Sequence, residues 1–448
     1  MNTITEPERN VPVVHEADLV VIGGSCTGVF AAVRAARMGL KVAIVEKQNC
    51  FGGVATAAAV NIWHSLHETT GERRIIGGLT AEVIDRLRRR GAVLESPNPS
   101  SAHRMNTEEL KIELDELVVA HGITPFLHTV FAAPVREGDR LTAVIVENKN
   151  GRQAVRARQF VDATGDADLA LRCGLPSYDP GSLQPPTTCA KIWGLGSLGD
   201  FDWQRAVREH GAEFGLEKDW GWGGPIPGLD DVQLRADTHV FECDTSDGAQ
   251  LSRAEIEGRR QVRAIMDTIR KYGPKDAKIA LVDLPSSIGA RETRRIAARY
   301  RMTEHDVLYG TRFDDAIANG SYRVDIHHAD GPGITFRYLD GTEVVIPERG
   351  TPGREGRWRD PIPEDPTFYQ VPFRSLVQDE IANLVLAGRM LDADKNAFSA
   401  VRVMVNMNQT GEAAGVASAI AMQSGCAIRE VDVQGLRNAL AAGGSIII

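Results

Sequence analysis

Short apolar runs alternate with a helical pattern near the start of the chain. Asp18–Ile22 is a run of mainly β-branched residues, which predicts a buried strand. The glycine-rich residues 23–28 predict a tight loop, and Val29–Met38 places apolar residues at helical spacing. Gly39 ends this helix, and Lys41–Val45 predicts a second buried strand. The pattern therefore predicts a strand, a loop, a helix and a second strand in direct succession.

The same patterns continue along the chain and then weaken. Further helices are predicted at Leu79–Arg89, Thr107–Ala120, Glu255–Tyr272 and Val403–Met422, and further strands at Ile123–Val130, Leu141–Asn148, Ala154–Asp162 and Leu384–Arg389. Residues 180–370 have little periodicity and are rich in glycine and proline. We therefore predict an α/β fold: a discontinuous Rossmann-like domain, residues 1–179 and 371–448, with an inserted α+β substrate domain, residues 180–370.

The first unit has the arrangement that holds the diphosphate of a dinucleotide. Gly23 permits the sharp turn, and Gly28 lets the helix and the strand pack closely. Glu46 follows the second strand, where a carboxylate can accept hydrogen bonds from ribose hydroxyls and disfavours a 2′-phosphate. Ser25 replaces the middle glycine of G-x-G-x-x-G, with Gly24 beside it. The alternative is an ordinary βαβ unit with an acidic strand end.

Composition narrows the classes of function. The chain has 448 residues, 25% of them charged, and a net charge of −9, which argues against a general nucleic-acid-binding role. We find no apolar run long enough to cross a bilayer, and residues 1–10 lack the apolar core of a signal peptide. We therefore expect a cytoplasmic protein without a membrane span, and leave a homo-oligomer open.

The six cysteines are scattered, with no C-x-x-C pair and no zinc-like cluster, so no metal site is predicted. Most scattered cysteines in such a chain are small buried apolar groups. Cys26 and Cys50 are of more interest because they flank the predicted dinucleotide loop. Cys26 lies at the start of a predicted helix, which should favour its thiolate.

Several motifs in one order resemble a known family. They are residues 52–56, 161–168, 288–296, 322–327, 369–374, 383–389, 402–404 and 411–415. Together with the glycine loop they resemble the flavoprotein group with two dinucleotide-binding domains, and more closely the bacterial FAD-dependent oxidoreductase family. The resemblance covers nearly the whole chain and implies FAD, noncovalent by default, in the discontinuous domain.

By this resemblance Glu46 and Lys47 lie at the adenosine ribose, and the helix that holds Gly411 aims its positive end at the flavin ring. Val130 faces the adenine through its backbone. The cofactor contacts it implies are Gly23, Gly24, Ser25, Cys26, Thr27, Gly28, Glu46, Lys47, Gly52, Gly53, Ala55, Thr56, Val130, Ala163, Thr164, Gly165, Asp166, Gly388, Arg389 and Gly411. A structural alternative stands beside some of them: Asp166 can cap a helix, and Arg389 can form an ion pair.

Histidines are the candidate proton carriers, because a histidine titrates near neutral pH. His327 is the first candidate, with His328 beside it. Asp325 alternates with His327 along a predicted strand, so the two should share a face. His64 and His67 are second candidates, and one of them could instead carry a covalent flavin link. The alternative for Asp325 and His327 is a surface pair of polar residues.

Arginines are the candidate substrate ligands. On a helix Arg291 and Arg295 would share a face, with Arg294 offset, and the three could bind an anionic or hydroxylated substrate. The alternative is a helix held by ion pairs to Glu292. Arg402, and Asn406 after it, could touch either substrate or flavin. We predict His327, Arg291 and Arg402 as the catalytic residues.

The sequence favours an FAD-dependent oxidoreductase that moves a hydride between a small organic substrate and flavin N5. Trp193, Trp203, Trp220 and Trp222 suit a ring or sugar-like substrate, or else belong to a core. Alternatives are a disulfide or heterodisulfide reductase and a non-catalytic FAD-binding scaffold or sensor; a plain NAD dehydrogenase is disfavoured. No second glycine loop, which a pyridine nucleotide would need, lies in residues 180–370. We therefore expect oxygen, a quinone or a protein as the electron acceptor.

Overall fold

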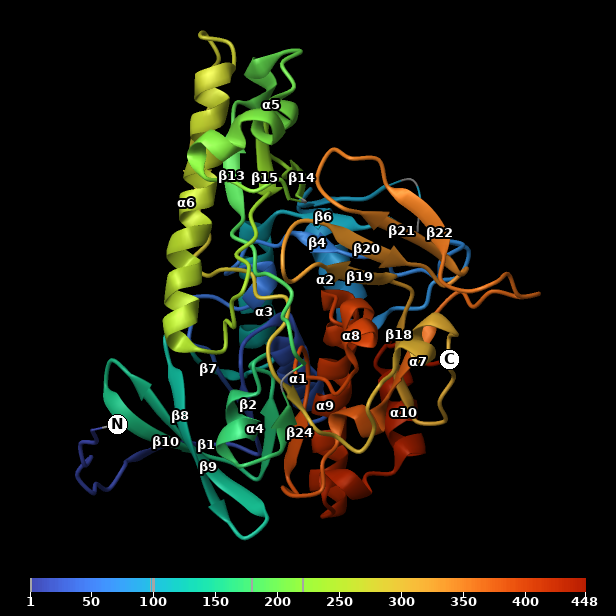
Figure 1. Cartoon of the computed structure of the whole chain (residues 1–448). Coiled ribbons are helices and arrows are strands. Elements are labelled where there is room, and N and C mark those ends of the chain that lie inside the picture. The colour runs from blue at the N-terminus through green and yellow to red at the C-terminus, as the bar shows by residue number, and fades with distance from the viewer. Residues whose placement is uncertain (1, 97, 99–100, 179, 220) are drawn as a thin grey trace.

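A parallel sheet of five strands, in the order β24-β11-β2-β3-β7, lies in the lower half of the molecule (Figure 1). Its strands are β2 (Leu19–Ile22), β3 (Val42–Val45), β7 (Thr124–Phe126), β11 (Gln159–Asp162) and β24 (Leu384–Leu386). All but β7 are buried along their whole length, as parallel strands covered on both faces are. The structure is a computed structural model and describes residues 2–96, 98, 101–178, 180–219 and 221–448.

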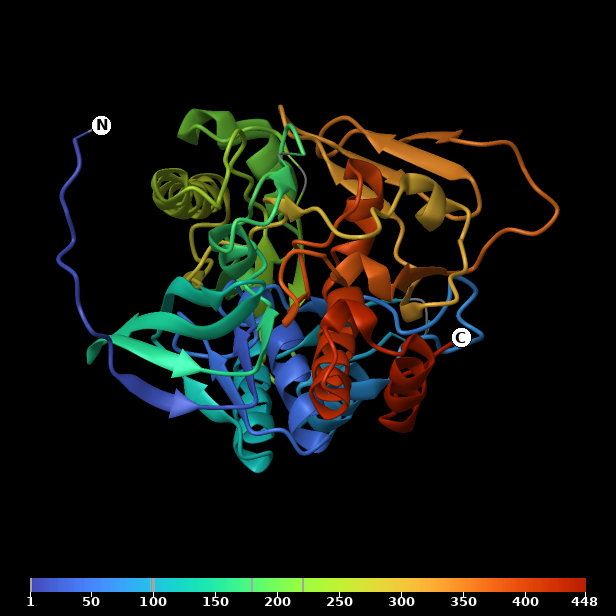
Figure 2. The same ribbon diagram turned by 90° about the horizontal axis from the view of Figure 1, so that it is seen from below.

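Two helices pack closely on this sheet and on each other. They are α1 (Cys26–Arg37) and α9 (Met404–Ser424), which lie side by side in both views (Figures 1 and 2). A Cβ on Gly411 would lie 2.1 Å from the carbonyl oxygen of Thr27, and a Cβ on Gly415 would lie 2.1 Å from that of Ala31. The glycines of α9 therefore allow the close contact between the two helices.

The upper half holds two antiparallel sheets and a long helix (Figure 1). One sheet has the order β14-β15-β13-β16 and lies beside α6, and the other has the order β19-β20-β21-β22. The bounds are β13 (Ala190–Trp193), β14 (Trp222–Pro225), β15 (Val232–Ala236), β16 (Ala280–Asp283), α6 (Gly248–Tyr272), β19 (Val324–His327), β20 (Ile334–Arg337), β21 (Thr342–Ile346) and β22 (Arg354–Arg357).

The remaining elements surround these layers. The sheet β1-β10-β9-β8 extends from the lower side, next to the N-terminal residues, which run away from the body (Figure 2). The other strands are β1 (Val13–Glu16), β4 (Ile62–Trp63), β5 (Val93–Leu94), β6 (His103–Met105), β8 (Val130–Glu137), β9 (Arg140–Asn148), β10 (Gly151–Arg156), β12 (Ser177–Tyr178), β17 (Arg295–Ile296), β18 (Ala316–Gly320) and β23 (Tyr369–Pro372). The other helices are α2 (Gly78–Arg89), α3 (Thr107–Ala120), α4 (Asp168–Arg172), α5 (Trp203–His210), α7 (Glu304–Leu308), α8 (Lys395–Val401) and α10 (Val433–Ala442).

Most predicted elements agree with these bounds, but the helix predicted at Glu255–Tyr272 begins earlier, at Gly248, and two predicted strands are wrong. Ile123–Val130 is divided into β7 and the start of β8, because the chain turns at His128 with φ of +50°. Ala154–Asp162 is divided between β10 and β11, which belong to different sheets. The first helix begins at Cys26 and not at Val29, since the Ser25 side chain accepts a hydrogen bond from the Gly28 amide and caps it.

The α/β fold class is confirmed by the central parallel sheet and its helices. β24 pairs in parallel with β11, so a segment late in the chain completes a sheet begun at its start. The domain bounds 1–179, 180–370 and 371–448 stay a prediction, and residue 179, at the first boundary, lies outside the described residues. Among the described residues no helix combines the length and the apolar character needed to cross a membrane.

A buried carboxyl on α9 predicts a pH-dependent stability. Glu412 accepts hydrogen bonds from the Leu79 amide at 3.1 Å and the Ser445 hydroxyl at 3.2 Å, with Arg34 at 3.7 Å. Burial raises its pKa from 4.5 to about 7, although Arg34 acts in the opposite direction. Because the folded pKa is the higher one, this stabilisation is complete below about pH 4.5 and is lost as the pH rises to about 7.

We therefore expect Glu412→Gln, which cannot titrate, to flatten this dependence. Between about pH 5 and pH 8 the wild-type free energy of unfolding should fall by a few kcal/mol more than that of the variant. Urea unfolding of both proteins at the two pH values measures the difference, and other titrating groups cancel in the comparison. Parallel pH dependences would contradict the shifted pKa.

Candidate functional site

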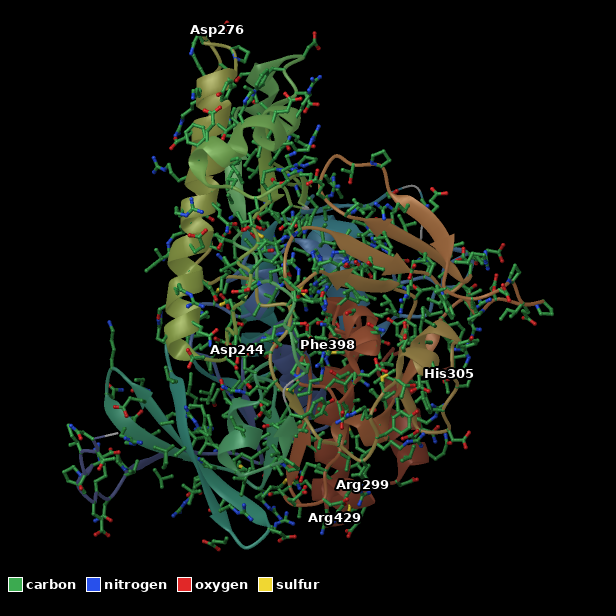
Figure 3. The ribbon with its side chains drawn as sticks, in the orientation of Figure 1. Asp244, Asp276, Arg299, His305, Phe398 and Arg429 are labelled. Carbon is green, nitrogen blue, oxygen red and sulfur yellow. The ribbon has the colours of Figure 1, made fainter. Side chains whose placement is uncertain are left out.

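A cavity of about 480 Å³ lies above the carboxyl ends of the parallel strands and continues under the two upper sheets. This is where open α/β sheets bind ligands, and the volume is within the range of small-molecule sites. Figure 3 labels Phe398 of α8 near the middle of the molecule, and its side chain is fully buried. The cavity has two parts: a loop end at the glycine-rich segments and an inner end at β19 and the start of α9.

The first glycine loop leaves no room for larger residues. Gly23 has φ of +98°, and a Cβ there would lie 2.4 Å from the carbonyl oxygen of Ala163. A Cβ on Gly28 would lie 1.9 Å from the carbonyl oxygen of Gly23. Ser25 has φ of −61°, which any residue adopts, and its hydroxyl accepts a hydrogen bond from the Gly28 amide at 3.3 Å. Serine at position 25 is therefore compatible with the loop, and its side chain caps α1.

A second glycine turn packs on the first. Gly52 and Gly53 have φ of +111° and +56°, and the Gly52 amide donates to the carbonyl of Gly24 at 2.8 Å. Ala55 is fully buried, and the Thr56 hydroxyl donates to the Phe51 carbonyl at 2.6 Å, so neither reaches the cavity. The two turns together form a backbone-lined loop end.

Glu46 is held in place at this end by backbone amides. One carboxylate oxygen accepts a hydrogen bond from the Gly24 amide at 2.6 Å and the other from the Gln48 amide at 2.8 Å. Burial raises the pKa of Glu46, and these hydrogen bonds oppose the rise. Glu46 and Lys47 both line the cavity.

Asp166, which follows β11, and Arg389, which follows β24, form an ion pair at the carboxyl ends of these two strands. The Asp166 carboxylate accepts from Arg389 at 2.6 Å and from the Thr293 hydroxyl at 2.9 Å. Burial would raise the pKa of Asp166, but the charges of Arg389 and Lys47 outweigh it and the pKa is lowered. The ion pair raised as the structural alternative is present, and both of its members also line the cavity. Thr293 is a partner that sequence reasoning does not find.

The structure brings most of the predicted cofactor residues to the wall of this one cavity. They are Gly23, Ser25, Cys26, Thr27, Glu46, Lys47, Gly52, Gly53, Ala163, Thr164, Gly165, Asp166, Gly388 and Arg389. Gly24, Gly28, Ala55, Thr56, Val130 and Gly411 do not line it. Of these, Gly24 and Gly28 support the loop, Gly411 packs on α1, and Val130 is 51% exposed on β8.

At the inner end Asp325 and His327 lie on one face of β19, as the alternation predicts. His327 Nε2 is 3.6 Å from Asp325 Oδ1, and the Tyr322 hydroxyl donates to Asp325 Oδ2 at 2.6 Å. Arg402 Nη2 is 3.8 Å from the same Oδ2. The rings of His64 and Tyr322 are in contact, with centroids 3.9 Å apart and planes inclined by 32°. All five residues line the cavity.

The inner histidines are neutral, which corrects the expectation that they titrate near neutral pH. Burial, together with the charge of Arg291, lowers the pKa of His327 well below its usual value. Burial and Arg323 lower the pKa of His64 to about 3. His67 and His328 do not line the cavity; His328 contacts the Pro332 carbonyl and the Thr335 hydroxyl instead.

The predicted helix through Arg291–Arg295 is wrong, because residues 291–294 are irregular and Arg295 begins β17. Arg291 lines the cavity. Arg294 donates to the carbonyl of Ser246 at 2.8 Å. Arg295 is fully buried, pairs with Glu292 and lies 4.1 Å from the ring centroid of Phe398. The three arginines therefore have separate roles, and Arg291 alone among them faces the cavity.

Asn406 is buried on α9 and donates to the Tyr369 hydroxyl at 3.0 Å, so it does not reach the cavity. Among the tryptophans Trp222 lines the cavity and Trp193 and Trp203 do not; Trp220 lies outside the described residues. The structure adds several liners that the sequence analysis does not name as site residues: Arg323, which lies within the 322–327 motif, and Ile334, Phe336 and Met407, which lie in none of the motifs. Their only signal is their closeness in the chain to Asp325 and Arg402.

The cysteines near the loop are thiols. Burial raises the pKa of Cys26 to about 12 and also raises that of Cys50, which corrects the expected thiolate at the start of α1. Cys26 Sγ contacts the carbonyl of Gly52, and Cys50 Sγ contacts Thr56. All six cysteines are free. The disulfide reductase alternative therefore lacks a cysteine pair.

The family model described as FAD dependent oxidoreductase matches residues 18–440. The chain belongs to this family. The oxidoreductase accordingly binds FAD, and the fit is physical: glycine turns expose backbone at the loop end, and a Cβ at several of these glycines would collide with neighbouring backbone. The residues at this end would hold the dinucleotide portion of FAD.

Curated relatives match shorter parts of the oxidoreductase. A soluble pyridine nucleotide transhydrogenase of Chromohalobacter salexigens is 31% identical over 169 residues, 36% of this chain and 34% of the relative. A dihydrolipoyl dehydrogenase of Manduca sexta is 49% identical over 82 residues, 17% of this chain and 16% of the relative. The matched segments thus span about a third or less of these relatives.

Solved structures resemble the oxidoreductase over most of its length at low identity. A geranylgeranyl bacteriochlorophyll reductase-like protein of Thermoplasma acidophilum is 12% identical with a TM-score of 0.45, covering 96% of this chain and 83% of that one. The p-nitrophenol 4-monooxygenase PnpA of Pseudomonas putida is 10% identical with a TM-score of 0.47, covering 95% and 85%.

Proposed function

We propose that this oxidoreductase transfers a hydride between a small organic substrate and N5 of FAD, with the substrate at the inner end of the cavity. One observation carries the proposal: the glycine turns and the cluster of Asp325, His327, Arg291 and Arg402 line the same continuous cavity. A substrate beside the cluster therefore shares one space with the cofactor. Apolar side chains of Ile334, Phe336 and Met407 line the same end and keep water out.

The chain's own residues supply the proton chemistry. When bound, FAD accepts two electrons and one hydrogen nucleus as a hydride. A hydroxyl or amino group that loses a hydride from its carbon must also release a proton, and a nearby base must accept it. His327 is neutral, and its buried Nδ1 has no hydrogen-bond partner among the described residues. With Asp325 facing Nε2, Nδ1 is the atom that accepts this proton.

Anaerobic bleaching of the holoenzyme tests the proposal. Hydroxy acids, amino acids, sugars and aromatic alcohols are added one at a time under nitrogen, and the flavin absorbance is followed. A substrate class should bleach the flavin completely and yield its two-electron oxidation product in equal amount. Dithionite serves as the control that the flavin can be reduced. Catalysis at this site would be contradicted if no substrate class reduced the oxidised flavin and no oxidised product class reoxidised the reduced flavin.

NADH and NADPH should reduce this flavin only slowly. The described residues contain a single all-parallel sheet, and its glycine loop is the one assigned to FAD. We therefore propose oxygen, a quinone or a protein as the partner that exchanges electrons with the enzyme. Stopped-flow mixing of NADH and NADPH with the oxidised holoenzyme under nitrogen measures this, and rapid stoichiometric bleaching by either would overturn it.

A further inference from the structure

The inner end of the cavity holds a guanidinium without a matching carboxylate. Arg291 donates through Nη1 to the Pro185 carbonyl and the Thr187 hydroxyl, both uncharged. It forms no ion pair among the described residues, and its Nε and Nη2 donate no hydrogen bond to them. Burial and the charge of Arg402 lower its pKa to about 10 against the opposing charges of Asp325 and Asp219, neither of which forms an ion pair with it, so it remains a cation at neutral pH. A cation that is largely withdrawn from water costs free energy unless a nearby anion compensates its charge.

Two more arginines line the same end with donors to spare. Arg402 donates through Nη2 to Gln184 at 3.2 Å and to the Asp325 carbonyl at 3.3 Å, and its buried Nε has no partner among the described residues. Arg323 lies 4.2 Å from the ring centroid of Phe336, and its buried Nε is likewise unpartnered there. Asp325 is the one carboxylate among the liners of this end: its Oδ2 accepts a hydrogen bond from Tyr322 and lies 3.8 Å from Arg402, while its buried Oδ1, 3.6 Å from the neutral His327, has no hydrogen-bond partner among the described residues.

The charges of the cavity are therefore unequally distributed. At the loop end Glu46 and Asp166 balance Lys47 and Arg389. At the inner end three arginines face one aspartate, and both histidines are neutral. Among the lining side chains this leaves an excess of two positive charges where we propose that the substrate binds, and Asp219, which does not line the cavity but acts on Arg291, offsets part of it.

We infer that the inner end binds an organic acid, whose carboxylate is held by Arg291 and Arg402; the inference rests on the proposed function of this site. The planar guanidinium matches a carboxylate with two parallel hydrogen bonds, and both arginines retain unused donors. Arg402 also contacts Asp325, so an acid bound to it has its adjoining carbon atoms beside the Asp325–His327 pair. The arginines thus select the substrate class and orient the reacting carbon.

Ligand binding to the oxidised holoenzyme under nitrogen tests this, with the flavin absorbance followed so that reduction by an acid is recognised as turnover and not as binding. Lactate, succinate, mandelate and benzoate are titrated against their uncharged amides, with flavin difference spectra and calorimetry as readouts. At least one acid should bind roughly 10- to 100-fold more tightly than its amide, because charge-assisted hydrogen bonds are lost in the amide. Absence of binding by every acid, equal binding of acids and amides, or tighter binding of inorganic phosphate or sulfate would each overturn the inference.

Matched variants assign the binding to the two arginines. Arg291→Gln and Arg402→Gln should each weaken acid binding roughly tenfold or more, whereas Arg294→Gln, which changes a neighbour outside the cavity, should not. FAD content is measured for each protein, and Arg402→Gln carries the test if Arg291→Gln does not retain FAD. Unchanged acid binding in both variants, with or without a shift in flavin potential, would show that the arginines do not hold the acid.

The outcome is separable from that of the proposed function. Arginine-dependent binding of an acid that never bleaches the flavin would support the binding site and count against hydride transfer. Bleaching by neutral substrates alone would support hydride transfer and overturn the inference.

Discussion

Purified Gly28→Ala protein is expected to carry less than roughly a tenth of the FAD of the wild-type protein. The added Cβ would lie 1.9 Å from the carbonyl oxygen of Gly23, which is backbone and cannot turn aside like a flexible side chain. To relieve this overlap, either the start of α1 or the loop that faces the dinucleotide must shift. The ratio of flavin to protein absorbance after reconstitution with excess FAD measures the effect.

Gly248→Ala is the matched control, since a Cβ there meets nothing within 4 Å and no left-handed φ is involved. It should bind FAD as the wild type does. Far-ultraviolet circular dichroism of Gly28→Ala shows whether the protein still folds, so that lost FAD is distinguished from lost structure. Full FAD content in Gly28→Ala would contradict the tight loop geometry.

Replacement of His327 by asparagine should lower the rate of flavin reduction by substrate roughly 10²-fold or more. FAD content should not change, because His327 lies at the inner end and not at the glycine turns. The loss arises because asparagine cannot take up the proton that leaves the substrate. Single-turnover reduction under nitrogen measures the rate directly, and substrate dependence separates the effect on binding from that on the chemical step.

His328→Asn is the control for this variant, since its side chain lies next in sequence but outside the cavity. Its flavin reduction rate should remain near that of the wild type. The wild-type rate should also hold steady between about pH 6 and pH 8, because the pKa of His327 lies well below 6.5 and the base stays unprotonated there. Equal losses in the His327 and His328 variants would remove His327 from the proton transfer.

The loop end of the site could be predicted because its residues are close in sequence and their types are dictated locally. Gly23, Gly28 and Glu46 occupy places set by a turn, a close approach and a strand end, and each leaves a signal in a short segment. Long helices were predictable for a similar reason, as in Thr107–Ala120, where the spacing of apolar residues agrees with the observed bounds.

The inner end could be predicted only in part, because it is assembled from segments far apart in the chain. The Asp325–His327 pair was predictable from strand alternation. The neutral state of His327, in contrast, depends on burial and on Arg291, which tertiary packing alone brings together. Likewise no local pattern indicates that residues 291–294 leave the helical conformation, or that Gly411 of α9 packs on α1 and does not line the cavity.

The seating of α9 on α1 bears on the order in which the enzyme matures. Synthesis releases the Gly23–Gly28 loop long before α9 and β24, yet Gly411 rests on the backbone of Thr27 and β24 completes the sheet. A nascent chain that lacks these late segments has an open-sided crevice in place of a closed one. Because part of the sheet and of the cavity wall comes from these late segments, we expect flavin binding to require a nearly complete chain.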